Sequence, residues 1–194
     1  MKIILASKSG VRKQILDNHN IDNEVIVSNV DEEEVKQSLL AEGANPLVIS
    51  KNLAEIKSIR VSSKHLDRIV IGADSVISLN EELINKPNSR EEAYTILKKL
   101  NNLKHYLISS VCISKNGAMI WNFSDTSELK MKNFTEKKLK EYLDKISTDI
   151  LLAYGVYQIE ANGLALFEYI RGDIESIMGL PIKDIINYIN QYKK

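Results

Sequence analysis

Residues 69–77 read Ile-Val-Ile-Gly-Ala-Asp-Ser-Val-Ile, a strongly β-branched run with polar residues at its centre. β-branched side chains pack well on a pleated surface, so we expect a buried strand over residues 68–77. Asp74 lies inside that strand. Because a buried carboxylate loses its hydration, Asp74 must be paired, bound to a metal or catalytic. We interpret it as a functional residue.

Strands and helices alternate on both sides of this run. A hairpin is expected between residues 106–114 and 118–130, because Asn116-Gly117 is a typical two-residue turn. Further strands are predicted at residues 2–5, 24–27 and 150–160, and helices after Gly10 and Asp31 and at residues 46–62, 89–100, 135–146, 162–169 and 181–191. This order predicts an α/β fold, and the hairpin argues against a purely parallel sheet.

The composition is that of an ordinary globular protein. The 194 residues suit a single domain over residues 1–194, by the guide of about 100–200 residues per domain. Lys and Arg number 26, as do Asp and Glu, and this zero balance argues against a nucleic-acid polymer as partner. The single Cys112 lies in an apolar run and is expected to be a buried strand residue. No segment approaches the ~18 apolar residues of a membrane span. We therefore expect no membrane association and a cytoplasmic protein.

Residues 6–13 read Ala-Ser-Lys-Ser-Gly-Val-Arg-Lys and join the first strand to a helix. Ser7 or Ser9 is a natural N-cap for that helix. Backbone N–H groups at a helix N-terminus bind anions, and two hydroxyl groups and Arg12 would strengthen such a site. The segment is a plausible phosphate cradle, although the P-loop spacing is absent. An ordinary capped turn is the alternative.

Other polar groups are less informative alone. The acidic run at residues 31–34 is usually a solvated surface, and Lys86-Pro87 is normally just a turn. Glu160, in the apolar run 150–160, raises the same question as Asp74.

Taken in order, these stretches resemble the Maf family of nucleotide pyrophosphatases over nearly the whole chain. The matching segments are residues 5–9 with Arg12, 30–32, 53–57, 72–75, 86–87, 97–105, 157–160, 172–173 and 179–181. The resemblance implies a Maf/inosine-triphosphatase-like mixed sheet flanked by helices, with two lobes around a cleft. It implies hydrolysis of a nucleoside triphosphate between the α- and β-phosphates, with Mg²⁺ or another divalent ion such as Mn²⁺ or Co²⁺.

The same resemblance assigns roles to individual residues. Asp74 matches the proton acceptor, and Glu32 matches an acidic residue linked to metal binding, in which Asp74 could share. The polar and basic residues matched to the cleft are Ser7, Arg12, Lys57 and Lys86. Such cations would neutralise and position a triphosphate.

This sequence departs from the family pattern at several positions. Val11 replaces an Arg, Ser75 a Thr and Glu160 a Gln, all at positions that govern base choice in the family; Ala153 replaces a Lys. A carboxylate only accepts hydrogen bonds, which suits the adjacent N–H donors of guanine or the amine of cytosine. We therefore expect dTTP and UTP not to be the best substrates, and a modified guanosine triphosphate is one candidate.

The losses at Val11 and Ala153 leave a second hypothesis open, a non-catalytic nucleotide-binding regulator linked to cell division. A homodimer is common in the family. His105 matches a family residue and could equally have a structural role. Tyr154 and Tyr157 are expected in the core rather than as a base-stacking platform.

Overall fold

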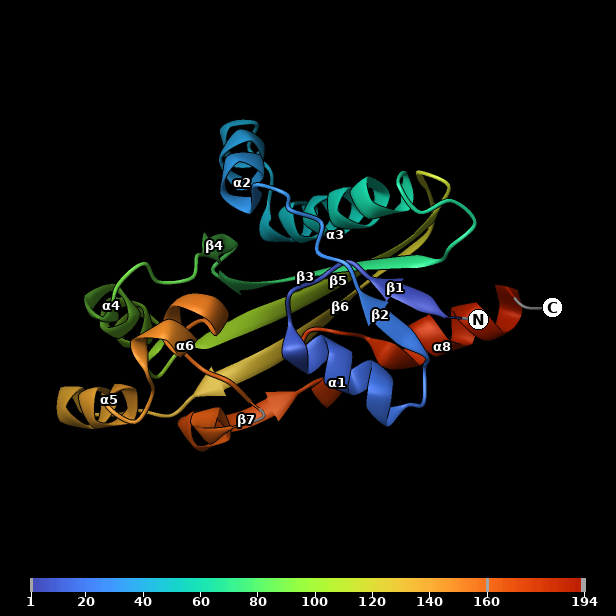
Figure 1. The fold of residues 1–194 in the computed structure, drawn as a ribbon. Coiled ribbons are helices and arrows are strands. Elements are labelled where there is room, and N and C mark those ends of the chain that lie inside the picture. The colour runs from blue at the N-terminus through green and yellow to red at the C-terminus, as the bar shows by residue number, and fades with distance from the viewer. Residues whose placement is uncertain (1, 160, 193–194) are drawn as a thin grey trace.

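The computed structural model describes residues 2–159 and 161–192, which form one mixed sheet with helices on both faces (Figure 1). Within this part of the chain the sheet has seven strands in the order β2-β1-β3-β5-β6-β7, with β4 paired to β3. The strands are β1 (Ile3–Leu5), β2 (Asn23–Val25), β3 (Val70–Leu79), β4 (Glu82–Ile84), β5 (Lys104–Lys115), β6 (Ala118–Met131) and β7 (Phe167–Arg171). β1 pairs in parallel with β2 and β3, and the remaining pairs are antiparallel. The predicted mixed α/β sheet is confirmed.

Helices cover both faces of the sheet. They are α1 (Gly10–Asn18), α2 (Glu32–Ala41), α3 (Pro46–Ser62), α4 (Arg90–Leu100), α5 (Glu136–Leu143), α6 (Thr148–Tyr154), α7 (Ile174–Ile177) and α8 (Ile182–Tyr192), with a 3₁₀ turn at Asn162–Leu166. α3 lies on one face, and α1 and α8 lie on the other (Figure 1). Alternate residues of β1 pack accordingly: Ile4 packs in a cluster with Val61 of α3, whereas Ile3 packs with side chains of α1 and α8.

Glycine at position 72 allows α3 to approach β3 closely. A Cβ atom there would meet the carbonyl oxygen of Ala54 at 2.2 Å and the backbone nitrogen of Ser58 at 2.6 Å. Both contacts are with helix backbone, so no side-chain rotation could relieve them. Because α3 packs this closely, Lys57 on its inner face reaches the strand residue Asp74.

The strand predicted over residues 150–160 is wrong for residues 150–159, the part of it that the structure describes. Residues 148–154 form α6, which begins where the hydroxyl of Ser147 accepts a hydrogen bond from the Ile150 N–H and ends at Gly155 with φ of 96°. Its apolar residues do not indicate a buried strand, since Ile150, Leu152 and Tyr154 are all exposed. The helix predicted at residues 162–169 is also partly wrong, because β7 begins at Phe167.

Three further expectations concern Cys112, membrane spans and the domain organisation. Cys112 is buried in β5, as predicted. None of the helices in the described ranges is long and apolar enough to cross a membrane. The division into two lobes and the single domain over residues 1–194 stay predictions.

Candidate active site

A cavity of about 420 Å³ opens beside the middle of β3, at the N-terminus of α1. Its size lies in the usual range of about 300–1,000 Å³ for small-molecule sites. One part is apolar, formed by residues such as Ile77, Ile96 and Leu107. The other part carries all of the predicted site residues that the structure describes: Ser7, Val11, Arg12, Glu32, Lys57, Asp74, Ser75 and Lys86.

Lys57 joins the two carboxylates of this cavity. Its Nζ atom lies 2.8 Å from Oδ1 of Asp74 and 2.9 Å from Oε1 of Glu32. Lys57 and Asp74 are 5% and 6% exposed, so this pair is shielded from water, whereas Glu32 is half-buried. Burial raises the pKa of Glu32, but the charge and the hydrogen bond of Lys57 together lower it by more. The pKa of Glu32 therefore lies below its ordinary value.

The second oxygen of Asp74 has no partner in the part of the chain that the structure describes. Oδ2 is buried and forms no hydrogen bond within the described chain. A buried polar atom without a partner is costly, so it normally serves a ligand, an ion or an ordered water. This oxygen is therefore free to bind a water molecule or a cation in the cavity.

Arg12 is held by four protein acceptors. Its Nε donates to the carbonyl of Gly179 at 2.8 Å, and Nη2 donates to Oγ of Ser75 at 3.1 Å. Nη1 donates to the carbonyl of Ala73 at 2.9 Å and to Oγ of Ser7 at 3.1 Å. Arg12 lines the cavity, and its hydrogen bonds fasten α1 to β3 and to the segment before α8. Its role in substrate binding stays a prediction.

The first turn of α1 borders the cavity. Ser9 is the N-cap, and its hydroxyl accepts from the Arg12 N–H at 3.3 Å. Ser7 accepts from the Ser9 N–H at 3.2 Å and also lines the cavity. The predicted arrangement of two hydroxyl groups at a helix start is confirmed, and such a start favours an anion.

Lys86 reaches the cavity from the loop after β4. Its Nζ donates to the carbonyl of Ala153 at 2.9 Å. Ala153 is the position where a family lysine is missing, so the ammonium of Lys86 lies against that part of the backbone. Burial of the ammonium lowers the pKa of Lys86, while Glu32 and Asp74 raise it, and the net shift is downward.

Several cavity residues were missed by sequence reasoning. Lys8, Lys36, Tyr154 and Gln158 all line the cavity. Lys36 lies four residues after Glu32 on α2, a spacing that places both on one helix face and could have been noticed. Tyr154 is 45% exposed, so the expectation that both tyrosines belong to the core is wrong for Tyr154.

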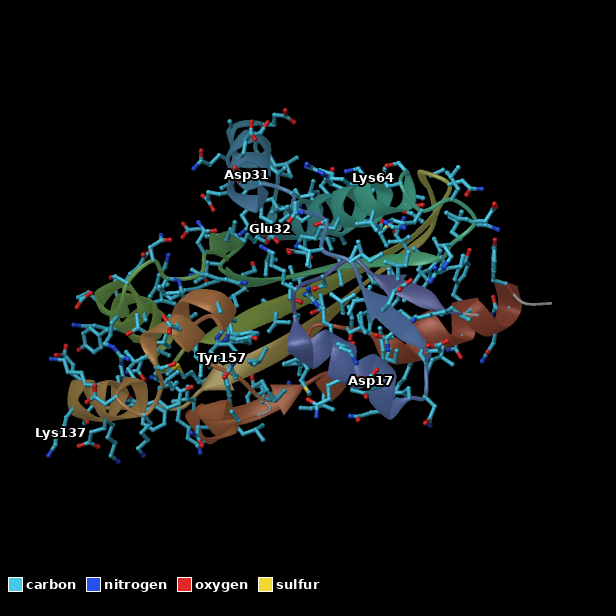
Figure 2. All side chains as sticks on the ribbon, in the orientation of Figure 1. Asp17, Asp31, Glu32, Lys64, Lys137 and Tyr157 are labelled. Carbon is cyan, nitrogen blue, oxygen red and sulfur yellow. The ribbon has the colours of Figure 1, made fainter. Side chains whose placement is uncertain are left out.

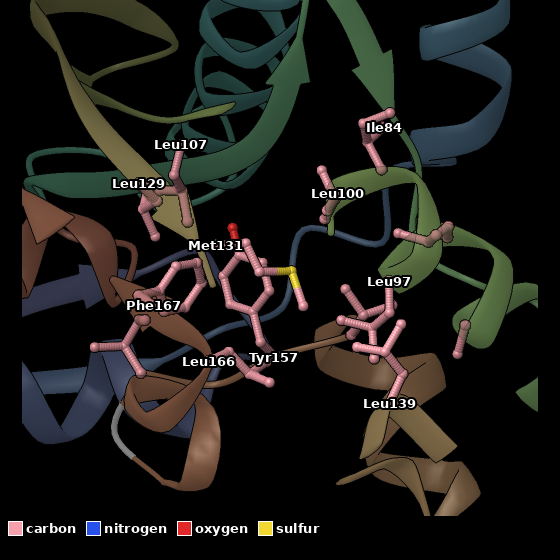
Figure 3. Close-up of a cluster of buried hydrophobic side chains, with 14 of the residues drawn as sticks. Ile84, Leu97, Leu100, Leu107, Leu129, Met131, Leu139, Tyr157, Leu166 and Phe167 are labelled. Carbon is pink, nitrogen blue, oxygen red and sulfur yellow. The ribbon is translucent and has the colours of Figure 1, made fainter. Parts of the chain in front are cut away.

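Tyr157 does belong to the core. Its ring packs edge-on against Phe167 with centroids 4.9 Å apart, among Leu107, Leu129 and Met131 (Figure 3). Its hydroxyl lies 3.0 Å from Nε2 of His105, which is fully buried. Burial lowers the pKa of His105 to about 4. The structural interpretation of His105 fits these contacts, and its neutral ring anchors a tyrosine that also borders the cavity.

Of the three positions predicted to govern base choice, two are described. Val11 and Ser75 both line the cavity, and Ser75 shares a hydrogen bond of 2.8 Å with Ser109. Glu160 lies outside the described residues.

Comparison with known proteins decides the family. Residues 2–192 match the family model described as Maf-like protein. The chain belongs to the Maf-like family. A relative named nucleoside triphosphate pyrophosphatase, from Pelagibacter ubique (strain HTCC1062), is 56% identical over 192 residues, which are 99% of this chain and 98% of the relative. A relative named 7-methyl-GTP pyrophosphatase, from Brucella abortus biovar 1 (strain 9-941), is 33% identical over 193 residues, 100% of this chain and 97% of the relative.

Among solved structures, a HAM1 protein from Coxiella burnetii matches with a TM-score of 0.44 and 14% sequence identity. The match covers 68% of this Maf-like chain and 73% of the other. A likeness this distant says nothing about the reaction.

Proposed function

We propose that this Maf-like protein hydrolyses a nucleoside triphosphate to the monophosphate and pyrophosphate. The observation that carries the proposal is the buried Asp74 carboxylate, in a cavity lined by cations. Lys57 holds one of its oxygens, and the other has no hydrogen-bond partner among the described residues. The names of the relatives support the same reaction. Because the substrate belongs to the cellular nucleotide pool, we keep the cytoplasm as the proposed location.

The charges of the cavity suit a triphosphate. Its described lining carries five cations, Lys8, Arg12, Lys36, Lys57 and Lys86, and two anions, Glu32 and Asp74, which leaves a net charge of +3. The chain as a whole is neutral, so this surplus is a local property of the site. A polyanion would be attracted to the cavity and oriented in it.

In this proposal Asp74 acts on the attacking water. Its free Oδ2 accepts a proton from the water while the water oxygen bonds to phosphorus and the bond to the bridging oxygen breaks. The proton leaves Asp74 after the pyrophosphate departs. Lys57 holds Oδ1 and so fixes the orientation of the carboxylate. Ser7 and the N-terminus of α1 would receive phosphate oxygens.

The residues present fit a divalent cation. Asp74 Oδ2 has no hydrogen-bond partner among the described residues, and Glu32, which pairs with the same Lys57, is a second carboxylate nearby. Within the described residues no group of three or more His, Cys, Asp or Glu could hold a metal, so substrate oxygens and waters would complete the coordination, which suits Mg²⁺. A bound ion supplies charge neutralisation at the phosphoryl oxygens.

The base preference is part of the proposal. Val11 and Ser75 border the cavity, and Glu160 offers a carboxylate that only accepts hydrogen bonds. This chemistry favours guanine or cytosine, including a modified guanine, over thymine or uracil.

A nucleotide panel tests the function. Purified protein is incubated with GTP, 7-methyl-GTP, CTP, UTP and dTTP, each with Mg²⁺, Mn²⁺ or Co²⁺, and products are separated by ion exchange. We expect monophosphate and pyrophosphate in equal amounts. Diphosphate and orthophosphate, or no product from any nucleotide, would contradict the proposal, and the highest kcat/KM for dTTP would contradict the base preference.

A further inference from the structure

α2 contributes nothing to the core. Within this helix no residue is buried, and in Figure 2 Glu32 lies at the end of α2 that is nearest the sheet. Two of its residues, Glu32 and Lys36, nevertheless line the cavity. Core packing therefore does not explain why Glu32 and Lys36 lie on this face of α2.

The cavity cations differ in what holds them. Lys57 has two carboxylate partners, Arg12 has four acceptors and Lys86 has the carbonyl of Ala153. The other two cavity cations, Lys8 and Lys36, have no side-chain hydrogen bond or ion pair to any residue in the described ranges. Lys8 is exposed, whereas Lys36 is half-buried. The charge of Lys36 is a small contribution that lowers the pKa of both Glu32 and Lys86, in keeping with a position near both groups.

From these contacts we infer that Lys36 is a further substrate-binding residue, which α2 brings to the phosphate groups of the triphosphate. The inference rests on the proposed function for its substrate. A lysine whose donors are unused can give them to phosphate oxygens without breaking a protein contact. Lys57 and Arg12 would first have to break some of their present hydrogen bonds to the protein. Lys36 also adds positive charge to a cavity that lacks the family lysine at position 153.

Two measurements test this role. The first is the affinity for inorganic tripolyphosphate by titration calorimetry in the presence of EDTA, so that no metal on Glu32 contributes. The second is KM for the best nucleotide with Mg²⁺. Lys36→Gln is expected to weaken tripolyphosphate binding and to raise KM by about 5- to 20-fold, with kcat changed by less than about threefold. Lys36→Arg should recover most of both losses, because it keeps the charge.

Lys64→Gln is the matched control. It removes the same charge from an exposed position beside α3, away from the cavity (Figure 2). Both Gln variants should melt close to the wild-type temperature, because Lys64 is exposed and the half-buried Lys36 has no side-chain hydrogen bond or ion pair within the described residues.

The outcomes distinguish a failure of the Lys36 role from a failure of the proposed function. If wild-type protein hydrolyses nucleotides while Lys36→Gln keeps the affinity and KM of Lys64→Gln, the role of Lys36 is wrong. If wild-type protein hydrolyses no nucleotide but binds tripolyphosphate, and only Lys36→Gln weakens that binding, the phosphate contact holds and the proposed function fails.

Discussion

The Nζ atom of Lys57 lies 2.8 Å from Asp74 and 2.9 Å from Glu32, so one buried ammonium serves both carboxylates of the site. Removing one partner of a buried ion pair leaves the other charge without compensation, and this usually costs more than the pair itself contributes. Lys57 is therefore expected to matter for folding as well as for catalysis.

Lys57→Gln should lower the free energy of unfolding by about 2–4 kcal/mol, measured by urea denaturation. In the Asp74→Asn background the same change should cost less, because a neutral Asn needs no counter-ion. Lys51→Gln, at an exposed position of α3, should change stability by less than about 0.5 kcal/mol. Equal losses from Lys57→Gln in both backgrounds would show that the pair is not coupled.

Gly72→Ala should displace α3 from β3. A new Cβ would meet backbone atoms of Ala54 and Ser58 at 2.2 and 2.6 Å, and we expect a loss of about 3 kcal/mol in stability. We also expect a fall in kcat/KM, because Lys57 moves with α3. Gly10→Ala is the control for stability, since a Cβ there has no neighbour within 4 Å. A Gly72→Ala protein as stable as Gly10→Ala would refute the close packing.

Arg12→Lys keeps the charge but loses the planar fork that reaches four acceptors. We predict a loss of about 2 kcal/mol in unfolding free energy, together with a higher KM. Lys13→Ala removes an exposed neighbour that only pairs with Asp17, and it should cost less than about 1 kcal/mol. The two variants are compared by thermal melting, and equal melting temperatures would mean that the four contacts contribute little.

His105 should make the protein sensitive to mild acid. Its pKa is lowered to about 4 in the fold, so between about pH 6.5 and 4 the unfolded chain binds a proton that the folded chain does not. The resulting stability is complete above pH 6.5 and is lost as the pH falls through about 4. From pH 6.5 to 5 this amounts to about 2 kcal/mol.

The measurement is urea denaturation at several pH values. His105→Gln should be less stable than wild type at pH 7 but should lose about 2 kcal/mol less between pH 6.5 and 5. Phe167→Leu disturbs the same cluster and keeps the histidine, so it should retain the wild-type slope. A His105→Gln protein with the wild-type slope would place the acid sensitivity elsewhere.

Local chemistry made much of this fold predictable. The β-branched run around Asp74, the Asn116-Gly117 turn and the Ser9 cap all lie where their short-range preferences place them. The strand prediction at residues 150–160 failed because it rested on apolar content alone. Ser147, just before this run, and Gly155 within it have the spacing of a helix cap and a helix end.

The arrangement of the site was harder to predict, because its contacts span long distances in the chain. The acceptors of Arg12 include Ala73 and Gly179, which lie 61 and 167 residues away in sequence. No local pattern could show that its donors are mostly occupied. The resemblance grouped Lys57 with Asp74. The four-residue spacing could have linked Lys36 to Glu32, but only the structure shows that this face of α2 lies beside the cavity.

Replacement of Asp74 tests the central claim most directly. Asp74→Asn and the control Asp125→Asn, in β6, are assayed for monophosphate and pyrophosphate formation from the best nucleotide, with tripolyphosphate binding as the measure of an intact site. We predict that Asp74→Asn loses at least about 10²-fold in kcat while binding tripolyphosphate, and that Asp125→Asn matches wild type. An Asp74→Asn protein that turns over at the wild-type rate would contradict the account.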